Sequence, residues 1–162
     1  MNIKNVVRCA FVLAFVAIAG TAQAQTATQT VTFAVNAINR VAFVGAPTLT
    51  ITTAVAGSAP TSVTNAASTW AVTTNQTGAK ITASIPSNMP AGLTLSASLA
   101  APVTATSTGF QALSTVPVDV VTTLTKLNAG SLAVTYKLDA TAAAGVVASS
   151  SRVVTYTITG GT

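Results

Sequence analysis

Apolar and small polar residues alternate along most of the chain. The alternation recurs in short segments separated by Gly, Pro, Asn and Ser, and no segment shows the spacing of an amphipathic helix. Successive side chains of a strand point to opposite faces of a sheet, so the pattern predicts strands with one buried face and one solvated face. About seven to nine strands at this spacing predict an all-β fold, a single antiparallel, immunoglobulin-like β-sandwich.

The longest alternating segment lies near the amino terminus. Five of its apolar side chains share one parity: Val31, Phe33, Val35, Val41 and Phe43. Asn39 interrupts this apolar face, which predicts a bend or bulge within residues 36–40. We interpret residues 25–44 as the first strand of the domain or, alternatively, as a strand donated to the sheet of a neighbouring subunit.

Further segments have the same pattern. Strands are predicted at residues 48–53, around Trp70, and at residues 80–85, 93–99, 132–138 and 152–159, with an irregular strand in 113–127 because of Pro117. Residues 56–68 are predicted to form a loop, and Trp70 to lie in the core. Turn-forming residues predict two hairpins, one across residues 75–78 and a second across residues 128–130.

The first residues have the pattern of an export signal. Lys4 and Arg8 give a positive head, residues 10–19 are apolar, and residues 22–24 offer a small-residue cleavage site. This predicts a cleaved signal peptide at residues 1–24 and a mature β-sandwich domain at 25–162. The apolar stretch is shorter than the roughly 20 residues that cross a bilayer, so we expect no membrane insertion after cleavage. An uncleaved anchor is the alternative.

The expected location is therefore outside the cytoplasm: secreted, extracellular or on the cell surface, with the periplasm as a further option. The single cysteine, Cys9, lies in the predicted signal. The mature domain is then expected to fold without disulfides.

Residue types that commonly carry chemistry are missing after the predicted signal. The mature region contains no His, Glu or Cys, which removes the commonest general bases, thiol nucleophiles and transition-metal ligands. Asp119 and Asp139 are its only acidic side chains, and we interpret them as solvated surface residues. We therefore expect no enzymatic activity, no catalytic residues, no cofactor and no metal site.

Charge argues against a nucleic-acid partner. The net charge of +5 includes Lys4 and Arg8 of the predicted signal, and the remaining cations are scattered along the chain. Nucleic-acid binding needs a concentrated basic face, usually with stacking aromatic side chains between the charges. Asn75 begins a glycosylation triplet in a predicted turn, which we interpret as an ordinary turn sequence.

Strand edges rich in Thr and poor in charge favour association, because charged side chains normally guard edges against pairing. The sequence predicts a structural or adhesive surface protein that assembles into fibres or a coat through Val31, Phe33 and Val35, with itself or other surface proteins as partner. The alternative is a monomeric module that binds carbohydrate or protein. A carbohydrate site would need several exposed aromatic side chains, and of the aromatic candidates Trp70, Phe110, Tyr136 and Tyr156 only Phe110 lies in a predicted loop.

Three features of the sequence resemble those of a known group of proteins. They are the export signal, the Thr/Val/Ala-rich alternating strands and the closing segment VVTYTI at residues 153–158. In these features the sequence resembles secreted bacterial fibre and coat subunits of the spore-coat-U and pilin kind. The resemblance extends over the mature chain and implies a β-sandwich subunit of a surface structure. The chain departs from many such subunits in having no cysteine pair, and no functional residue is carried over from them.

Overall fold

A computed structural model describes residues 23–162, and the signal peptide predicted at residues 1–24 lies outside them except for its last two residues. The chain divides into two units, Met1–Ala34 and Val35–Thr162. The described part of the first unit, residues 23–34, contains no helix or strand, and all of its residues are exposed. The second unit contains every described strand.

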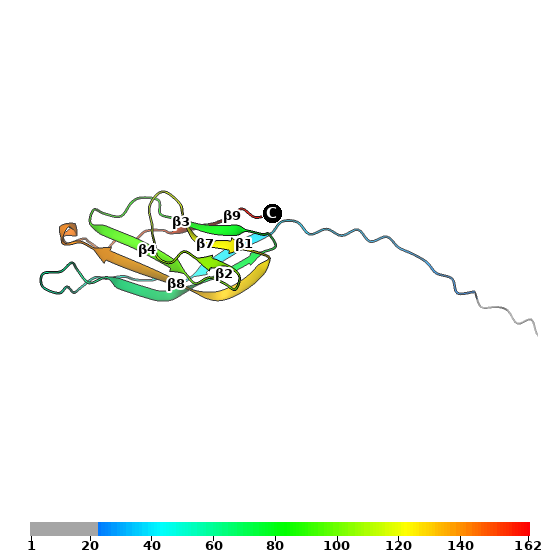
Figure 1. The fold of residues 1–162 in the computed structure, drawn as a ribbon, viewed down its shortest axis with the longest axis horizontal. Helices are drawn as coiled ribbons and strands as arrows, with labels where there is room; N and C mark the ends of the chain where they lie inside the picture. Colours follow the sequence, from blue (N-terminus) through cyan, green and yellow to red (C-terminus); the bar gives the residue numbers. More distant parts are fainter. Residues whose placement is uncertain (1–22) are drawn as a thin grey trace, which may run out of the picture. The chain divides into compact units, whose positions relative to one another are not determined.

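The second unit consists of two antiparallel sheets (Figure 1). The first sheet has the order β1 (Asn39–Val44), β2 (Val63–Thr74), β8 (Leu127–Ala140), β4 (Leu93–Leu99) and β6 (Gln111–Ala112). The second sheet has the order β5 (Thr106–Ser107), β7 (Val118–Leu124), β3 (Ala79–Ser84) and β9 (Thr155–Thr159). A short 3-10 helix, η1 (Ala142–Ala144), follows β8. The predicted all-β antiparallel sandwich is confirmed.

The core lies between the two sheets and is formed by alternate residues of their strands. Trp70 is 1% exposed, and its indole Nε1 donates a hydrogen bond to the carbonyl oxygen of Ala100 at 3.1 Å, which satisfies the polar atom of the buried ring. The prediction that Trp70 is a core residue is confirmed. The other large side chains that are less than 2% exposed are Ile81, Leu99, Leu124, Val120, Val121 and Val134.

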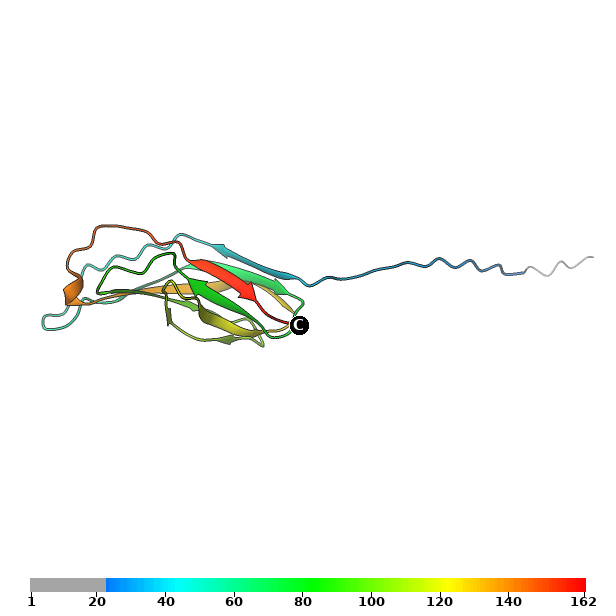
Figure 2. The same cartoon turned by 90° about the horizontal axis from the view of Figure 1, so that it is seen from above.

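The two sheets differ in length. β2 and β8 contain 12 and 14 residues, whereas β3, β7 and β9 contain 6, 7 and 5. At about 3.3 Å per residue, β8 is therefore roughly 20 Å longer than β7. We call the part where both sheets face each other the closed half. In the other part, around Val63, Leu93 and Ala140, the first sheet continues without strands opposite it, and we call this part the open half (Figure 2).

Both predicted hairpins are wrong. Residues 75–78 connect β2 of the first sheet to β3 of the second, and the turn after Leu124 connects β7 of the second sheet to β8 of the first. Backbone bonds hold these crossings together: Lys126 N–H donates to the Gln76 carbonyl at 2.9 Å, and Thr77 exchanges two bonds with Thr162. Strong turn sequences thus join strands of different sheets instead of neighbouring strands.

Residues 128–130, expected to form a turn, lie inside β8. The register with β2 shifts there, with Trp70 opposite Leu132 and Val72 opposite Ala129, so that two residues of β8 stand opposite Ala71. Ser131 has a φ of 57°, which fits a β-bulge. The Asn-Ala-Gly sequence therefore lies in a bulged strand.

The predicted strand at residues 48–53 is also wrong, since these residues form no strand. The ladder of β1 and β2 ends at the pair Val44 and Thr69, and Pro47 beyond it has no N–H to donate. Next to this segment β2 shifts register after Asn65, and the Asn65 side-chain amide, in place of a backbone group, donates to the Thr48 carbonyl at 3.1 Å.

Other boundaries differ from the predictions. The segment 56–68 is only partly a loop, because β2 begins at Val63. Strand structure in the amino-terminal segment begins at Asn39, and the last strand begins at Thr155, three residues after its predicted start. The prediction at 93–99 is confirmed by β4.

Candidate functional site

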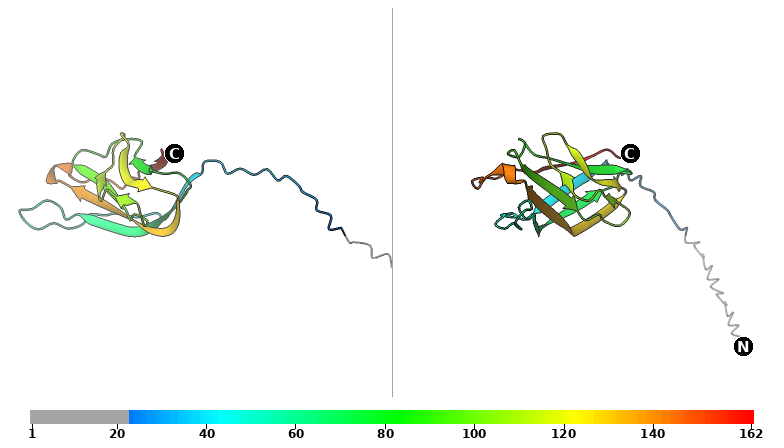
Figure 3. Two further views of the ribbon diagram at one scale, coloured as in Figure 1. Left: turned by 45° about the vertical axis from the view of Figure 1, so that its right-hand side comes forward. Right: turned by 60° about the vertical axis from the view of Figure 1, so that its left-hand side comes forward.

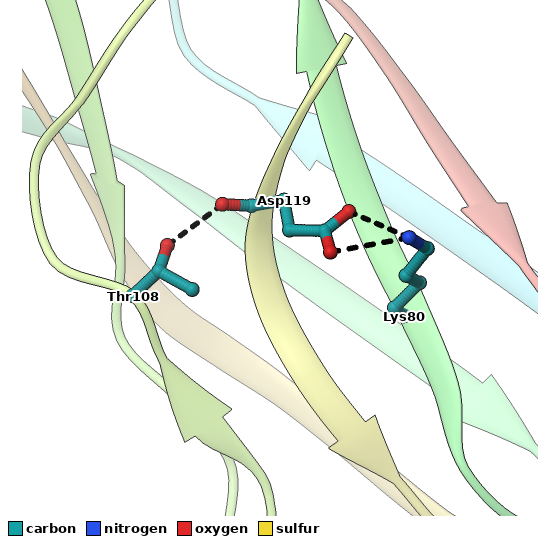
Figure 4. Close-up of polar contacts among 3 residues, drawn as sticks. All are labelled: Lys80, Thr108 and Asp119. Carbon is teal, nitrogen blue, oxygen red and sulfur yellow. Dashed lines mark hydrogen bonds and ion pairs between the residues drawn. The ribbon is translucent and has the colours of Figure 1, made fainter.

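The two acidic side chains of the described chain are paired with lysines at the surface. The Lys80 Nζ lies 2.9 Å from Oδ1 and 3.1 Å from Oδ2 of Asp119, with side-chain exposures of 47% and 40% (Figure 4). In the same view the Thr108 hydroxyl donates to the backbone carbonyl of Asp119 at 2.8 Å. An ion pair this exposed contributes little to stability.

Asp139 forms a second surface group. Its Oδ1 accepts a hydrogen bond from the Ser62 hydroxyl, and its Oδ2 lies 3.0 Å from the Lys137 Nζ. The Ser62 hydrogen bond first, and Lys137 in addition, hold the pKa of Asp139 below its usual value. Neither Asp119 nor Asp139 lines either of the two cavities described below. Among residues 23–162 no group of three or more His, Cys, Asp or Glu is placed to hold a metal ion.

Of the predicted aromatic candidates, only Phe110 is exposed. It is 45% exposed between β5 and β6, and the Lys137 Nζ lies 5.5 Å from the centre of its ring. Trp70 and Tyr136 are buried, and Tyr156 is half-buried. The carbohydrate-binding alternative would need several exposed aromatic side chains close together. These four residues do not form such a cluster.

The predicted association residues are highly exposed. Val31, Phe33 and Val35 are 72%, 89% and 80% exposed and belong to no strand of the described chain. Large apolar side chains at alternate positions, all open to solvent, are typical of a surface that contacts a partner.

Asn75 fixes the start of the second unit. Its backbone N–H donates to the Ile38 carbonyl at 3.2 Å, its Oδ1 accepts from the Ile38 N–H at 2.7 Å, and its Nδ2 donates to the Asn36 carbonyl at 2.8 Å. The amide thus acts like a strand partner and continues the line of β1 by three residues. We call these three bonds the Asn75 clamp.

A groove runs along the open half. It consists of two adjoining cavities of about 630 and 750 Å³ that share Leu49, Met89, Leu138 and Ser150 among their lining residues. Residues 45–54 form one wall, and residues 145–154 form the other. The floor is the inner face of the first sheet, with Leu95, Leu138 and Ala140. We call this cavity system the inter-sheet groove.

The two walls of the groove have few backbone partners. The structure contains no backbone-to-backbone hydrogen bond from residues 46–52 or 146–153 to any other described residue. In Figure 2 both segments are drawn as irregular chain without strand arrows. Figure 3 shows the end of the sandwich that carries η1 from two further directions. Backbone groups left unpaired at an edge are available to pair with another strand.

An aromatic cluster closes one end of the groove. Phe43 of β1 stacks on Tyr156 of β9 with ring centroids 3.8 Å apart, which joins the free edges of the two sheets. The hydroxyl groups of Tyr136 and Tyr156 are 2.9 Å apart. Burial raises the pKa of both phenols above the usual value, so both stay neutral at physiological pH.

Arg152 brings a positive charge to the groove wall. Its guanidinium donates to the Ser151 carbonyl at 2.9 Å and to the Asn88 carbonyl at 3.4 Å, while its buried Nε has no hydrogen-bond partner in the described chain. A buried donor without an acceptor is costly, and an incoming acceptor would relieve that cost.

Comparison with known proteins found no matching family model, no matching curated protein and no matching solved structure. No helix among residues 23–162 is long and apolar enough to cross a membrane. The sequence pattern singled out Val31, Phe33 and Val35, which the structure leaves exposed, but missed the groove and the Asn75 clamp. The signal for the groove was present in two predicted strands, 48–53 and the start of 152–159, that are left without partners.

Proposed function

We propose that this chain is a non-enzymatic, exported bacterial surface protein, structural or adhesive, that assembles with copies of itself into a fibre or coat. One observation carries the proposal: the exposure of Val31, Phe33 and Val35 on one parity of a segment without strand partners. Adding a strand to an exposed sheet edge is a common way to recognise an extended segment, because backbone bonds supply affinity and alternate side chains supply specificity.

The surface of the second unit supports this proposal. The outer residues of β9 are threonines, and the described strands carry few charges to oppose edge pairing. The export signal predicted from Lys4 and Arg8 supports a location at the cell surface or outside the cell. Both edge strands at the Phe43 and Tyr156 contact, β1 and β9, have one unpaired edge.

The test removes the apolar side chains without shortening the chain. The triple variant Val31→Ser, Phe33→Ser, Val35→Ser is compared with a control that changes the opposite parity, Thr30→Ser, Thr32→Ser, Ala34→Ser. Light scattering and negative-stain microscopy measure assembly, and circular dichroism measures folding. We expect filaments or large oligomers from the wild type and the control, and folded monomers from the first variant. A wild-type chain that stays monomeric at high concentration, or equal assembly of all three proteins, would overturn the proposal.

A further inference from the structure

We propose that the end of the sandwich that carries η1 is an adhesive surface for uncharged hydrocarbon. The surface consists of two loops, residues 53–61 and residues 141–148, which we call the tip loops. The inference rests on the proposed function, because it names the contact by which an adhesive fibre or coat holds its substrate.

The tip loops extend side by side from the ends of neighbouring strands. The first loop leads into β2 at Val63, the second follows β8 after Ala140, and β2 and β8 pair in one antiparallel ladder. The Ser62 hydroxyl donates to Oδ1 of Asp139, which joins the bases of the two loops. Figures 1 and 2 show both loops at the same end of the second unit. This end is opposite to the Asn75 clamp, which follows the last residue of β2.

Both tip loops have an ordered backbone. In the first loop Ser58 N–H donates to the Val55 carbonyl at 2.9 Å, which closes a β-turn. In the second loop Thr141 N–H donates to the Gly92 carbonyl at 2.8 Å, and Ala144 N–H donates to the Thr141 carbonyl at 3.1 Å. An ordered loop loses little conformational entropy when it meets a surface, so its exposed side chains are already placed for contact.

Apolar side chains of the tip loops lie in solvent. Val55 and Val146 are 69% and 105% exposed, and neither lines the cavity of about 630 Å³ that lies between the two loops. The same loops contain Val147, which is 40% exposed, and seven alanines. Apolar side chains that an ordered backbone holds in water are typical of a contact surface.

The tip loops contain no charged and no aromatic residue. Binding to a membrane surface depends on Lys and Arg together with Trp, Phe or Leu, and binding to nucleic acid depends on cations. Protein interfaces obtain most of their affinity from Trp, Tyr and Arg, and Val is under-represented among the residues that dominate it. An uncharged hydrocarbon surface needs none of these residues, and contact with it removes no charge of the loops from water. The composition of the tip loops therefore matches an uncharged apolar surface.

One pair of tip loops offers a small contact, so the strength of adhesion depends on the number of copies. Linking binding modules raises the overall avidity by about 10²–10⁴-fold without any new contact. A fibre or coat presents many copies of the tip loops to one surface. The tip loops and the Asn75 clamp, where residues 30–35 join the second unit, lie at opposite ends of β2, so adhesion and assembly are separable by mutation.

The experiment compares two pairs of exposed valines. The tip variant carries Val55→Ser and Val146→Ser. The control carries Val103→Ser and Val116→Ser, whose valines are 88% and 70% exposed and lie outside the tip loops. Retention on octadecyl-coated silica beads is measured against bare silica beads and against phosphatidylcholine vesicles. Negative-stain microscopy measures the assembly of each protein, and circular dichroism measures its folding.

We expect wild-type fibres and the control to bind the octadecyl beads about equally. The tip variant should still form fibres and bind about tenfold less, because it loses the apolar area that contacts the beads. Ammonium sulfate should strengthen the binding, since it favours apolar burial. The monomeric variant Val31→Ser, Phe33→Ser, Val35→Ser should bind at least about tenfold less than wild-type fibres, because its tip loops act singly.

Three outcomes would each overturn the inference: equal binding by the tip variant and the control, binding to the vesicles in preference to the beads, or loss of fibres in the tip variant. If wild-type fibres depend on Val31, Phe33 and Val35 but bind the beads no better than the tip variant does, the tip loops are not adhesive and the proposed function stands. If the wild type does not assemble, both proposals fail.

Discussion

The closed half and the open half of the sandwich use the same strands and differ in how those strands are covered. In the closed half the inner face of β4 and β8 packs against β3 and β7, and Leu99 and Val134 are fully buried. In the open half the same two strands continue to Leu95 and Leu138, which remain half-buried beneath irregular chain.

This difference in burial comes from the length of the opposite sheet and not from the alternation of residues in β4 and β8. Leu95, Ala97 and Leu99 follow one another on a single face of β4, yet their burial falls toward the end where the second sheet stops. The alternation within a strand therefore indicates which of its faces is apolar. The length of the opposite sheet determines how much of that face is buried. An apolar face that one chain leaves half-covered is where a second chain can contribute burial energy.

The largest expected effect comes from shortening two of the three leucines of β4, Leu99 and Leu95. Leu99→Ala should lower the free energy of unfolding by about 2–5 kcal/mol, because it leaves a cavity in a fully packed region. Leu95→Ala should cost about 1 kcal/mol, since part of that side chain is already in water. Urea unfolding of monomeric protein measures both, and equal costs would mean that the open half is as well packed as the closed half.

A pair of glycines tests whether residues 141–145, at the edge of the open half, are rigid. Gly92 has a φ of +79°, and an added Cβ would lie 2.7 Å from Thr141 Oγ1 and 2.8 Å from the Ala144 backbone nitrogen. Gly109 has a φ of +73° with nothing within 4 Å of an added Cβ, so it controls for backbone strain alone.

Gly92→Ala should therefore cost about 2–3 kcal/mol and Gly109→Ala about 1 kcal/mol. Residues 141–145 are expected to resist displacement because Thr141 N–H donates to the Gly92 carbonyl at 2.8 Å. Thermal unfolding of the two variants gives the comparison. Similar losses for both would show that residues 141–145 move aside freely.

The tyrosine pair where the two halves meet predicts sensitivity to alkali. Burial raises the folded-state pKa of Tyr136 and Tyr156 above the unfolded value of about 10. The stabilisation is therefore fully present below about pH 10 and is lost as the pH rises toward the folded-state pKa. Because the chain has only these two tyrosines, phenolate absorbance follows the pair directly. Tyr156→Phe should reduce the alkaline loss of stability, and an unchanged pH profile would contradict this account.

The smallest expected effect is at Asp139, on the outside of the open half. Its folded-state pKa is lowered, so the stabilisation is present above the unfolded pKa of about 3.9 and is lost as the pH falls through the folded-state value. Because the carboxylate lies at the surface and the Asp139 side chain is 33% exposed, solvent screens the interaction and the loss should be about 0.5 kcal/mol or less. Ser62→Ala should remove more of it than Lys137→Met, since the Ser62 bond is the larger cause. Acid titration of stability in low salt measures the difference.

The sequence predicted which segments face a core better than it predicted which segments pair. Alternation located β4 within its observed bounds and placed Trp70 inside, because burial on one face is a local property of a strand. Which strands pair depends on whether a turn returns the chain to the same sheet or leads it to the other sheet. The turns at residues 75–78 and after Leu124 each carry the chain to the other sheet, which turn composition does not specify.

The candidate site was predictable only in part, for the same reason. Exposure of Val31, Phe33 and Val35 follows from a strand pattern without a partner, but the groove arises from the different lengths of two sheets that are assembled from distant segments. The role of Asn75 depends on residues 36–38 lying beside it, a contact over 37 to 39 positions in sequence. Residues 48–53 and 152–154 alternate half-buried and exposed side chains as strands do, yet neither segment forms a strand in the described chain.

The bonds between Thr77 and Thr162 have a practical consequence for handling this protein. They place Thr162 beside the same turn that holds Asn36 through Asn75, so residue 162 lies in the closed half. An affinity tag or fluorescent protein joined after Thr162 would therefore sit at the end of the sandwich away from Gly92 and η1. Such fusions leave the far end unobstructed, which suits them to surface immobilisation and to imaging of single particles.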